Sequence, residues 1–129
     1  MDWNAIVWDS ARAGGLVAYI LVTLSVILGL VLSNGWKAEG WPRFISNGLH
    51  EHSTSLALVF TVVHGAALSI DPYMKFSLGE LLVPLASRYR PAWVAVGIVT
   101  AYLMLAIWVS GKLRPAIGYK WWRRLHYVT

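Results

Sequence analysis

The sequence predicts an all-α membrane protein, a helical bundle with three transmembrane helices in a single domain over residues 1–129. Apolar residues make up 57% of the chain and charged residues only 13%, and the mean hydropathy is +0.56, which is too apolar for a soluble domain of this size. A helix needs about 20 predominantly apolar residues to cross a bilayer. Three runs meet that length, at about residues 15–33, 53–70 and 92–110.

The first apolar run follows the segment MDWNAIVWDSAR, in which Asp2 and Asp9 precede the only base, Arg12. A secretory signal peptide would have a basic start and a small-residue cleavage site, so we expect this run to be retained as a helix. The chain has no cysteine, which excludes disulfides, thiolate chemistry and iron–sulfur ligation by its own residues.

The segments between and after the runs have distinct patterns. The connector NGWKAEGWPRFISNG has the glycine, proline and asparagine of a loop. The stretch FSLGELLVPLAS is apolar but too short to cross, and its Glu80 and Pro84 predict a short interfacial helix near 78–87. After Gly111, the basic and aromatic stretch KLRPAIGYKWWRRLHYVT is typical of a segment that precedes another span. We therefore expect the start of a fourth helix there, in a domain that either continues beyond it or stops.

The basic residues predict an orientation. With three spans, the N-terminus and the loop at 71–91 share one side, which carries four bases: Arg12, Lys75, Arg88 and Arg90. The other side carries seven: Lys37, Arg43, Lys112, Arg114, Lys120, Arg123 and Arg124. The positive-inside rule then places the N-terminus outside and the C-terminal segment in the cytoplasm. Because the bases flank hydrophobic spans, the net charge of +5 indicates membrane topology and not a nucleic-acid partner.

Three histidines lie at the edges of the second run, in the stretch LHEHSTSLALVFTVVHG. His50 and His64 are fourteen positions apart, which on a straight helix is a rise of about 21 Å and an angular offset of about 40°. They therefore share one stripe, one near each membrane face. His52 is twelve positions from His64, an offset of about 120°, so we expect it to be an interfacial residue off that stripe.

This pattern suits heme ligation. Histidine inside a membrane is rare and normally faces the bundle interior, and b-type hemes in helical bundles are held by histidines of facing helices. His50 and His64 could each supply one axial ligand, which would stack two hemes across the bilayer. Arg12, at the outer start of the first run, is either an interfacial anchor or the partner of a heme propionate.

These residues resemble the ferric-reductase-like transmembrane domain family, which includes bacterial heme-binding membrane subunits and the membrane part of NADPH oxidases. Three features carry the resemblance: the opening SARAGGLVAYILVTLSVILGL, the histidine pair of LHEHSTSLALVFTVVHG with thirteen residues between its members, and the basic, aromatic YKWWRRLHYVT. The resemblance covers almost the whole chain, and the histidine spacing is its most specific part.

The resemblance implies a heme b cofactor in an integral protein of the bacterial inner membrane. His50 and His126 resemble the axial ligands of the heme nearer the cytoplasm. His64 resembles one ligand of the outer heme, and the resemblance implies its second ligand about as far beyond His126 as His64 lies beyond His50. It also implies that the first helix enters from outside, in agreement with the charge distribution.

Two functions remain open from the sequence. One is transmembrane electron transfer by b-type heme, with a quinone, a redox protein or a separate domain as electron donor, since the chain has no glycine-rich flavin or nicotinamide motif. The other is a non-catalytic accessory subunit that packs against other membrane protein subunits in a respiratory or photosynthetic complex, either without a cofactor or with a chlorophyll-type pigment on His64. A transporter is disfavoured because no acid lies inside a span. In neither case do we assign catalytic residues.

Overall fold

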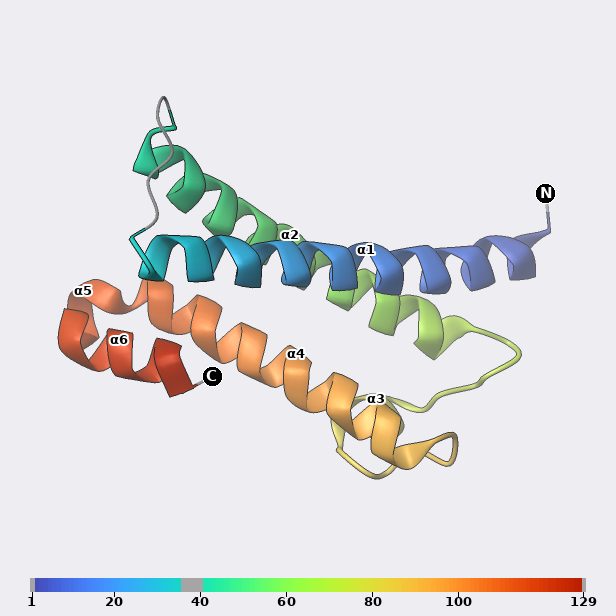
Figure 1. The fold of residues 1–129 in the computed structure, drawn as a ribbon. Helices are drawn as coiled ribbons and strands as arrows, with labels where there is room; N and C mark the ends of the chain where they lie inside the picture. Colours follow the sequence, from blue (N-terminus) through green and yellow to red (C-terminus); the bar gives the residue numbers. More distant parts are fainter. Residues whose placement is uncertain (1, 36–40, 129) are drawn as a thin grey trace. The chain divides into compact units, whose positions relative to one another are not determined.

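The computed structural model describes residues 2–35 and 41–128, so the connector residues 36–40, which include Trp36 and Lys37, lie outside it. The described residues contain no strand. They form the helices α1 (Trp3–Ser33), α2 (Arg43–Ile70), α3 (Leu78–Leu82), α4 (Pro91–Lys112), α5 (Arg114–Ile117) and α6 (Tyr119–Val128), shown in Figure 1. Of these, α1, α2 and α4 are long and apolar enough to cross a membrane. The prediction of an all-α membrane protein with three spans is confirmed.

The chain divides into two compact units, residues 1–74 with α1 and α2 and residues 75–129 with α3 to α6. The expectation of a single domain stays a prediction.

The helices extend beyond the apolar runs that predicted them. The Asp2 side chain caps α1 by accepting a hydrogen bond from the Asn4 backbone N–H at 3.1 Å, so the helix begins at Trp3. Pro42 occupies the N-cap of α2, which begins one residue later. Hydropathy detects only the part of a helix that lies at hydrocarbon depth, whereas the helix itself continues through the interface. The spans were therefore placed correctly but drawn too short.

The short helix expected near 78–87 is present but ends at Leu82, and its interfacial location stays a prediction. Ser77 and Glu80 form a capping box at its start. Val83 has an extended backbone, with φ −105° and ψ 118°, as the residue before Pro84. A proline disfavours the helical conformation of the residue before it and has no N–H to continue the helix.

In the first unit, α1 and α2 pack along faces of small residues, and Figure 1 shows the two helices crossing. The buried positions of α1 are Val7, Ala11, Gly14, Ala18 and Ser25, and those of α2 are Ser46, Ser53, Ala57 and Ala67. Most are spaced by three, four or seven residues, which places them on one face of each helix. Small residues allow transmembrane helices to approach closely. Large apolar side chains such as Leu16 and Tyr19 are 61% and 71% exposed, as expected for a lipid-facing surface.

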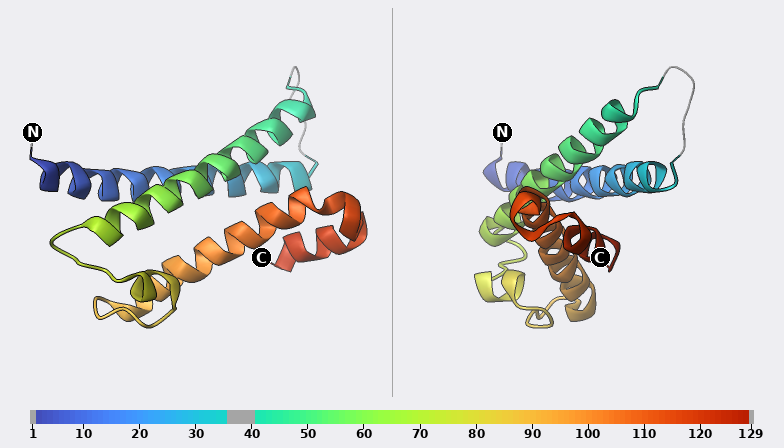
Figure 2. Two further views of the ribbon diagram at one scale, coloured as in Figure 1. Left: turned by 180° about the vertical axis from the view of Figure 1, so that it is seen from behind. Right: turned by 90° about the vertical axis from the view of Figure 1, so that its left-hand side faces the viewer.

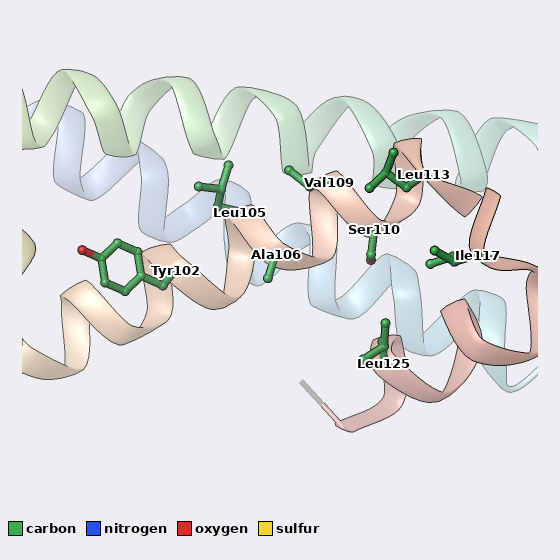
Figure 3. A pocket seen from close by; sticks show the side chains of 8 residues that line it. All are labelled: Tyr102, Leu105, Ala106, Val109, Ser110, Leu113, Ile117 and Leu125. Carbon is green, nitrogen blue, oxygen red and sulfur yellow. The ribbon is translucent and has the colours of Figure 1, made fainter. Parts of the chain in front are cut away.

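In the second unit, the chain reverses after α4 through the short α5, and α6 returns alongside α4 (Figure 2). Gly118, with φ +80°, provides the left-handed backbone conformation at the second bend. An apolar groove of about 460 Å³ lies between α4 and α6, and Figure 3 shows Ser110, Ile117 and Leu125 lining it from three helices. The expected C-terminal helix is therefore α6.

Candidate functional site

His64 is held by the backbone of α1. Its ring is half-buried, and its Nδ1 lies 2.6 Å from the carbonyl oxygen of Ala11, a residue only 3% exposed. A carbonyl can only accept a hydrogen bond, so Nδ1 must carry the proton. In the neutral ring the lone pair is then on Nε2, the nitrogen that would ligate a metal.

His50 has an equivalent arrangement with an additional hydroxyl group. Its Nδ1 lies 2.8 Å from the carbonyl oxygen of Ser25 and 3.1 Å from the Ser25 Oγ. The Thr54 hydroxyl donates to the His50 carbonyl at 2.8 Å, so the Ser25 hydroxyl donates to Thr54 Oγ1 at 2.6 Å. Ser25 Oγ therefore has a lone pair for the His50 N–H, and this ring too has its lone pair on Nε2.

The two histidines meet α1 in the same register. A shift of fourteen residues along α1, from Ala11 to Ser25, moves the contact fourteen residues back along α2, from His64 to His50. Positions fourteen residues apart lie on nearly the same face of a helix, within about 40°, so both histidines can face α1. The predicted common stripe is confirmed, and the two rings lie about 21 Å apart along α2.

His52 lies off this stripe, as predicted. Its side chain is exposed, and its Nδ1 hydrogen bonds to the carbonyl oxygen of Gly48, one turn earlier in the same helix, at 2.8 Å. This contact of His52 lies within its own helix, and α1 provides it with no such acceptor among the described residues. This makes His52 the natural control for the other two histidines.

His126 belongs to the second unit. Its ring stacks on Trp122, with centroids 5.1 Å apart and an interplanar angle of 27°, and Trp122 in turn lies 5.8 Å from the ring of Tyr119. The Arg114 guanidinium lies 5.0 Å above the Trp122 ring. These contacts fix the orientation of His126 within α6. Because His50 and His126 lie in units described separately, their pairing as ligands of one heme stays a prediction.

Arg12 is exposed near the start of α1, directly after the residue whose carbonyl binds His64. Its guanidinium lies 5.5 Å above the Trp8 ring, and Trp8 meets the ring of Tyr73 edge-on at 6.5 Å. An arginine on an indole suits an interfacial anchor, and its position beside the His64 acceptor suits a propionate partner. The propionate role stays a prediction.

The donor set fits a heme better than a metal ion held by protein groups alone. In the described parts of the chain, no three histidine, aspartate or glutamate side chains come together to hold a metal ion. A heme iron takes four ligands from its porphyrin and needs only one or two axial side chains. Histidines with Nδ1 bound to a carbonyl and the lone pair on Nε2 have the form that metal-ligating histidines normally take.

Ser25 and Thr54 were missed at the level of sequence. The signal was present, because Ala11, Ala18 and Ser25 recur every seven residues, as His50, Ala57 and His64 do. Two equal repeats on neighbouring helices predict paired positions. Hydropathy alone does not distinguish such small residues from the rest of an apolar run.

The family model for the ferric reductase like transmembrane component matches residues 14–129. The chain belongs to the ferric-reductase-like transmembrane family. The match includes all three candidate heme ligands and begins two residues after Arg12. Comparison with curated proteins found no match, and comparison with solved structures found none either. The family resemblance expected from the histidine spacing is confirmed.

Proposed function

We propose that this ferric-reductase-like chain carries electrons across the membrane one at a time through b-type heme, with His50 and His64 as axial ligands. The observation that carries the proposal is that both histidines of one transmembrane helix donate Nδ1–H to α1 carbonyls. Each therefore has its lone pair on Nε2, near opposite ends of the span. Membership of the ferric-reductase-like family supports the redox role.

The residues take distinct parts in this proposal. His50, with His126 from α6, would hold the heme nearer the cytoplasm, and His64 would supply one ligand of the outer heme. Bound heme supplies an iron that alternates between the ferric and ferrous states. The exposed apolar side chains of α1 and α2 keep the span in lipid, and the α1 carbonyls keep the two imidazoles oriented.

The chain needs an external reductant, because its sequence has no flavin or nicotinamide motif. A quinol would deliver its two electrons singly and release two protons, and a reduced redox protein would deliver one electron. The charge distribution supports an orientation with the N-terminus outside and the basic α6 in the cytoplasm. The resemblance to bacterial heme-binding membrane subunits supports the bacterial inner membrane.

The test is a reduced-minus-oxidised absorption spectrum of the purified protein. We expect b-type bands in the wild type, the loss of one heme in His50→Ala and of the other in His64→Ala, and an unchanged spectrum in His52→Ala. His52→Ala is the matched control because this side chain is exposed and bonded within α2. A folded wild-type protein without b-type bands would favour the accessory-subunit alternative, with or without a pigment on His64.

A further inference from the structure

The α1 carbonyls of Ala11 and Ser25, which bind the two histidines, each have a glycine four residues further along the helix. In an α-helix the carbonyl of residue i accepts the N–H of residue i+4, and the Cα–Cβ bond of residue i+4 is tilted back toward that carbonyl. A side chain from another helix can reach the second lone pair of the oxygen only if this space is open. Four residues after Ala11 is Gly15, and four residues after Ser25 is Gly29.

Both glycines leave space that a histidine ring uses. A Cβ atom on Gly15 would lie 2.9 Å from the His64 Nδ1 and 3.0 Å from its Cε1. A Cβ atom on Gly29 would lie 3.3 Å from the His50 Cε1. The first approach is shorter than side-chain contacts allow, so the ring would have to move, whereas the second requires a shift of a few tenths of an ångström.

Glycines elsewhere in the first unit do not share this property: a Cβ atom on Gly14 would lie 3.4 Å from the backbone nitrogen of His64, an ordinary contact that does not involve the ring. A Cβ atom on Gly48 or on Gly65, both in α2, would meet nothing within 4 Å. Glycine lowers helix stability relative to alanine, so Gly15 and Gly29 are unfavourable for α1 taken by itself. Gly15 and Gly29 are also fourteen residues apart, the spacing of the two histidines.

We infer that Gly15 and Gly29 are positioning residues, which open the Ala11 and Ser25 carbonyls so that the α2 histidines bind them through Nδ1. Each glycine thereby determines that Nε2 is the nitrogen offered to iron. The role of Nε2 rests on the proposed function, but the placement of the proton on Nδ1 does not. A side chain at position 15 disturbs its histidine more than one at position 29, because the contact with the ring is tighter. In addition, Ala11 has no hydroxyl to hold His64 if the hydrogen bond to the carbonyl is lost.

The inference is tested with Gly15→Ala and Gly29→Ala, with Gly65→Ala and Gly48→Ala as matched controls. Nitrogen NMR of the full chain labelled in its histidines reports which ring nitrogen carries the proton, with or without heme. We expect the Nδ1–H form for His64 and His50 in the wild type and in both controls. We expect it to be lost for His64 in Gly15→Ala and weakened for His50 in Gly29→Ala.

Heme measurements give the second readout. Loss of a partner of a ligating histidine typically costs about 10-fold to 100-fold in affinity, and a less basic ligand raises the heme midpoint potential. We expect both effects on the heme of His64 in Gly15→Ala, and smaller effects on the heme of His50 in Gly29→Ala. If Gly15→Ala fails to fold, Gly29→Ala still tests the positioning role, because the His50 ring needs to move only slightly to accommodate the added Cβ.

The outcomes separate the two proposals. Retention of the Nδ1–H form, the heme affinity and the midpoint potential in the folded alanine variants would overturn the positioning role. A wild type without heme whose histidines still lose the Nδ1–H form in these variants would overturn the proposed function and support the positioning role. A change in thermal stability alone, with the proton placement unchanged, would count against positioning.

Discussion

The imidazole rings of α2 owe their orientation to groups that have no charge. A histidine inside a membrane is costly unless its polar atoms have partners, and here the carbonyls of Ala11 and Ser25 serve as acceptors for His64 and His50. A backbone acceptor also has the advantage of a fixed position, since the helix itself holds it. The lone pair on Nε2 therefore follows from the geometry of α1.

Arg12 provides the prediction at this scale. If its charge neutralises a propionate of the outer heme, Arg12→Ala should lower the midpoint potential of one heme, because the reduced state has one more negative charge. With an effective dielectric of about 20, Coulomb's law makes such a shift on the order of 1 kcal/mol, or roughly 40 mV for one electron. A potentiometric redox titration measures the shift.

The control for this prediction is Arg12→Lys, which keeps the charge but not the planar guanidinium. We expect it to recover most of the potential lost in Arg12→Ala. Identical titrations for all three proteins would leave Arg12 as an interfacial anchor on Trp8, the role that the 5.5 Å contact already provides.

At the scale of elements, the loop around α3 depends on one carboxylate. Glu80 accepts hydrogen bonds from the Ser77 backbone N–H at 3.0 Å and from the Arg88 backbone N–H at 3.1 Å. The loop also contains Lys75, Leu85 and Arg90 in the left-handed region, where side chains other than glycine are strained. Glu80 thus joins the two ends of a loop whose backbone is otherwise unfavourable.

This arrangement predicts a pH dependence. The hydrogen bond from Ser77, and then that from Arg88, hold the pKa of Glu80 below its ordinary value of 4.5. The folded loop favours the ionised form, so the contribution to stability is fully present above pH 4.5 and is lost as the pH falls through the lowered pKa. We expect the Ser77 and Arg88 amide resonances to titrate together, with a midpoint below 4.5.

Removal of the charge should have the same effect at neutral pH. We expect Glu80→Gln to speed hydrogen exchange at the Arg88 amide, while Asp9→Asn, at an exposed acid of α1, leaves it unchanged. An amide midpoint at or above 4.5, or unchanged exchange in Glu80→Gln, would contradict this account of the loop.

At the scale of the whole molecule, hydropathy and spacing predicted most of what the structure shows. The three spans, the short helix α3 and the common stripe of His50 and His64 follow from the length of apolar runs and the period of a helix. Two features were not predicted. The end of α3 at Leu82 is set by Pro84, and the carbonyl acceptors of the histidines are set by the register of α1 against α2. Register is set by small residues that hydropathy weighs little, which is why Ser25 and the glycines escaped notice.

The central claim is that electrons cross the membrane through heme on the α2 histidines, and transfer across sealed vesicles tests it most directly. The heme-loaded protein is reconstituted in vesicles that contain ferricyanide, and dithionite, which does not cross lipid, is added outside. Our account predicts that the enclosed ferricyanide is reduced at equal rates with the wild type and His52→Ala, and at the rate of protein-free vesicles with His64→Ala. Equal rates in all of these vesicles, protein-free ones included, would contradict it.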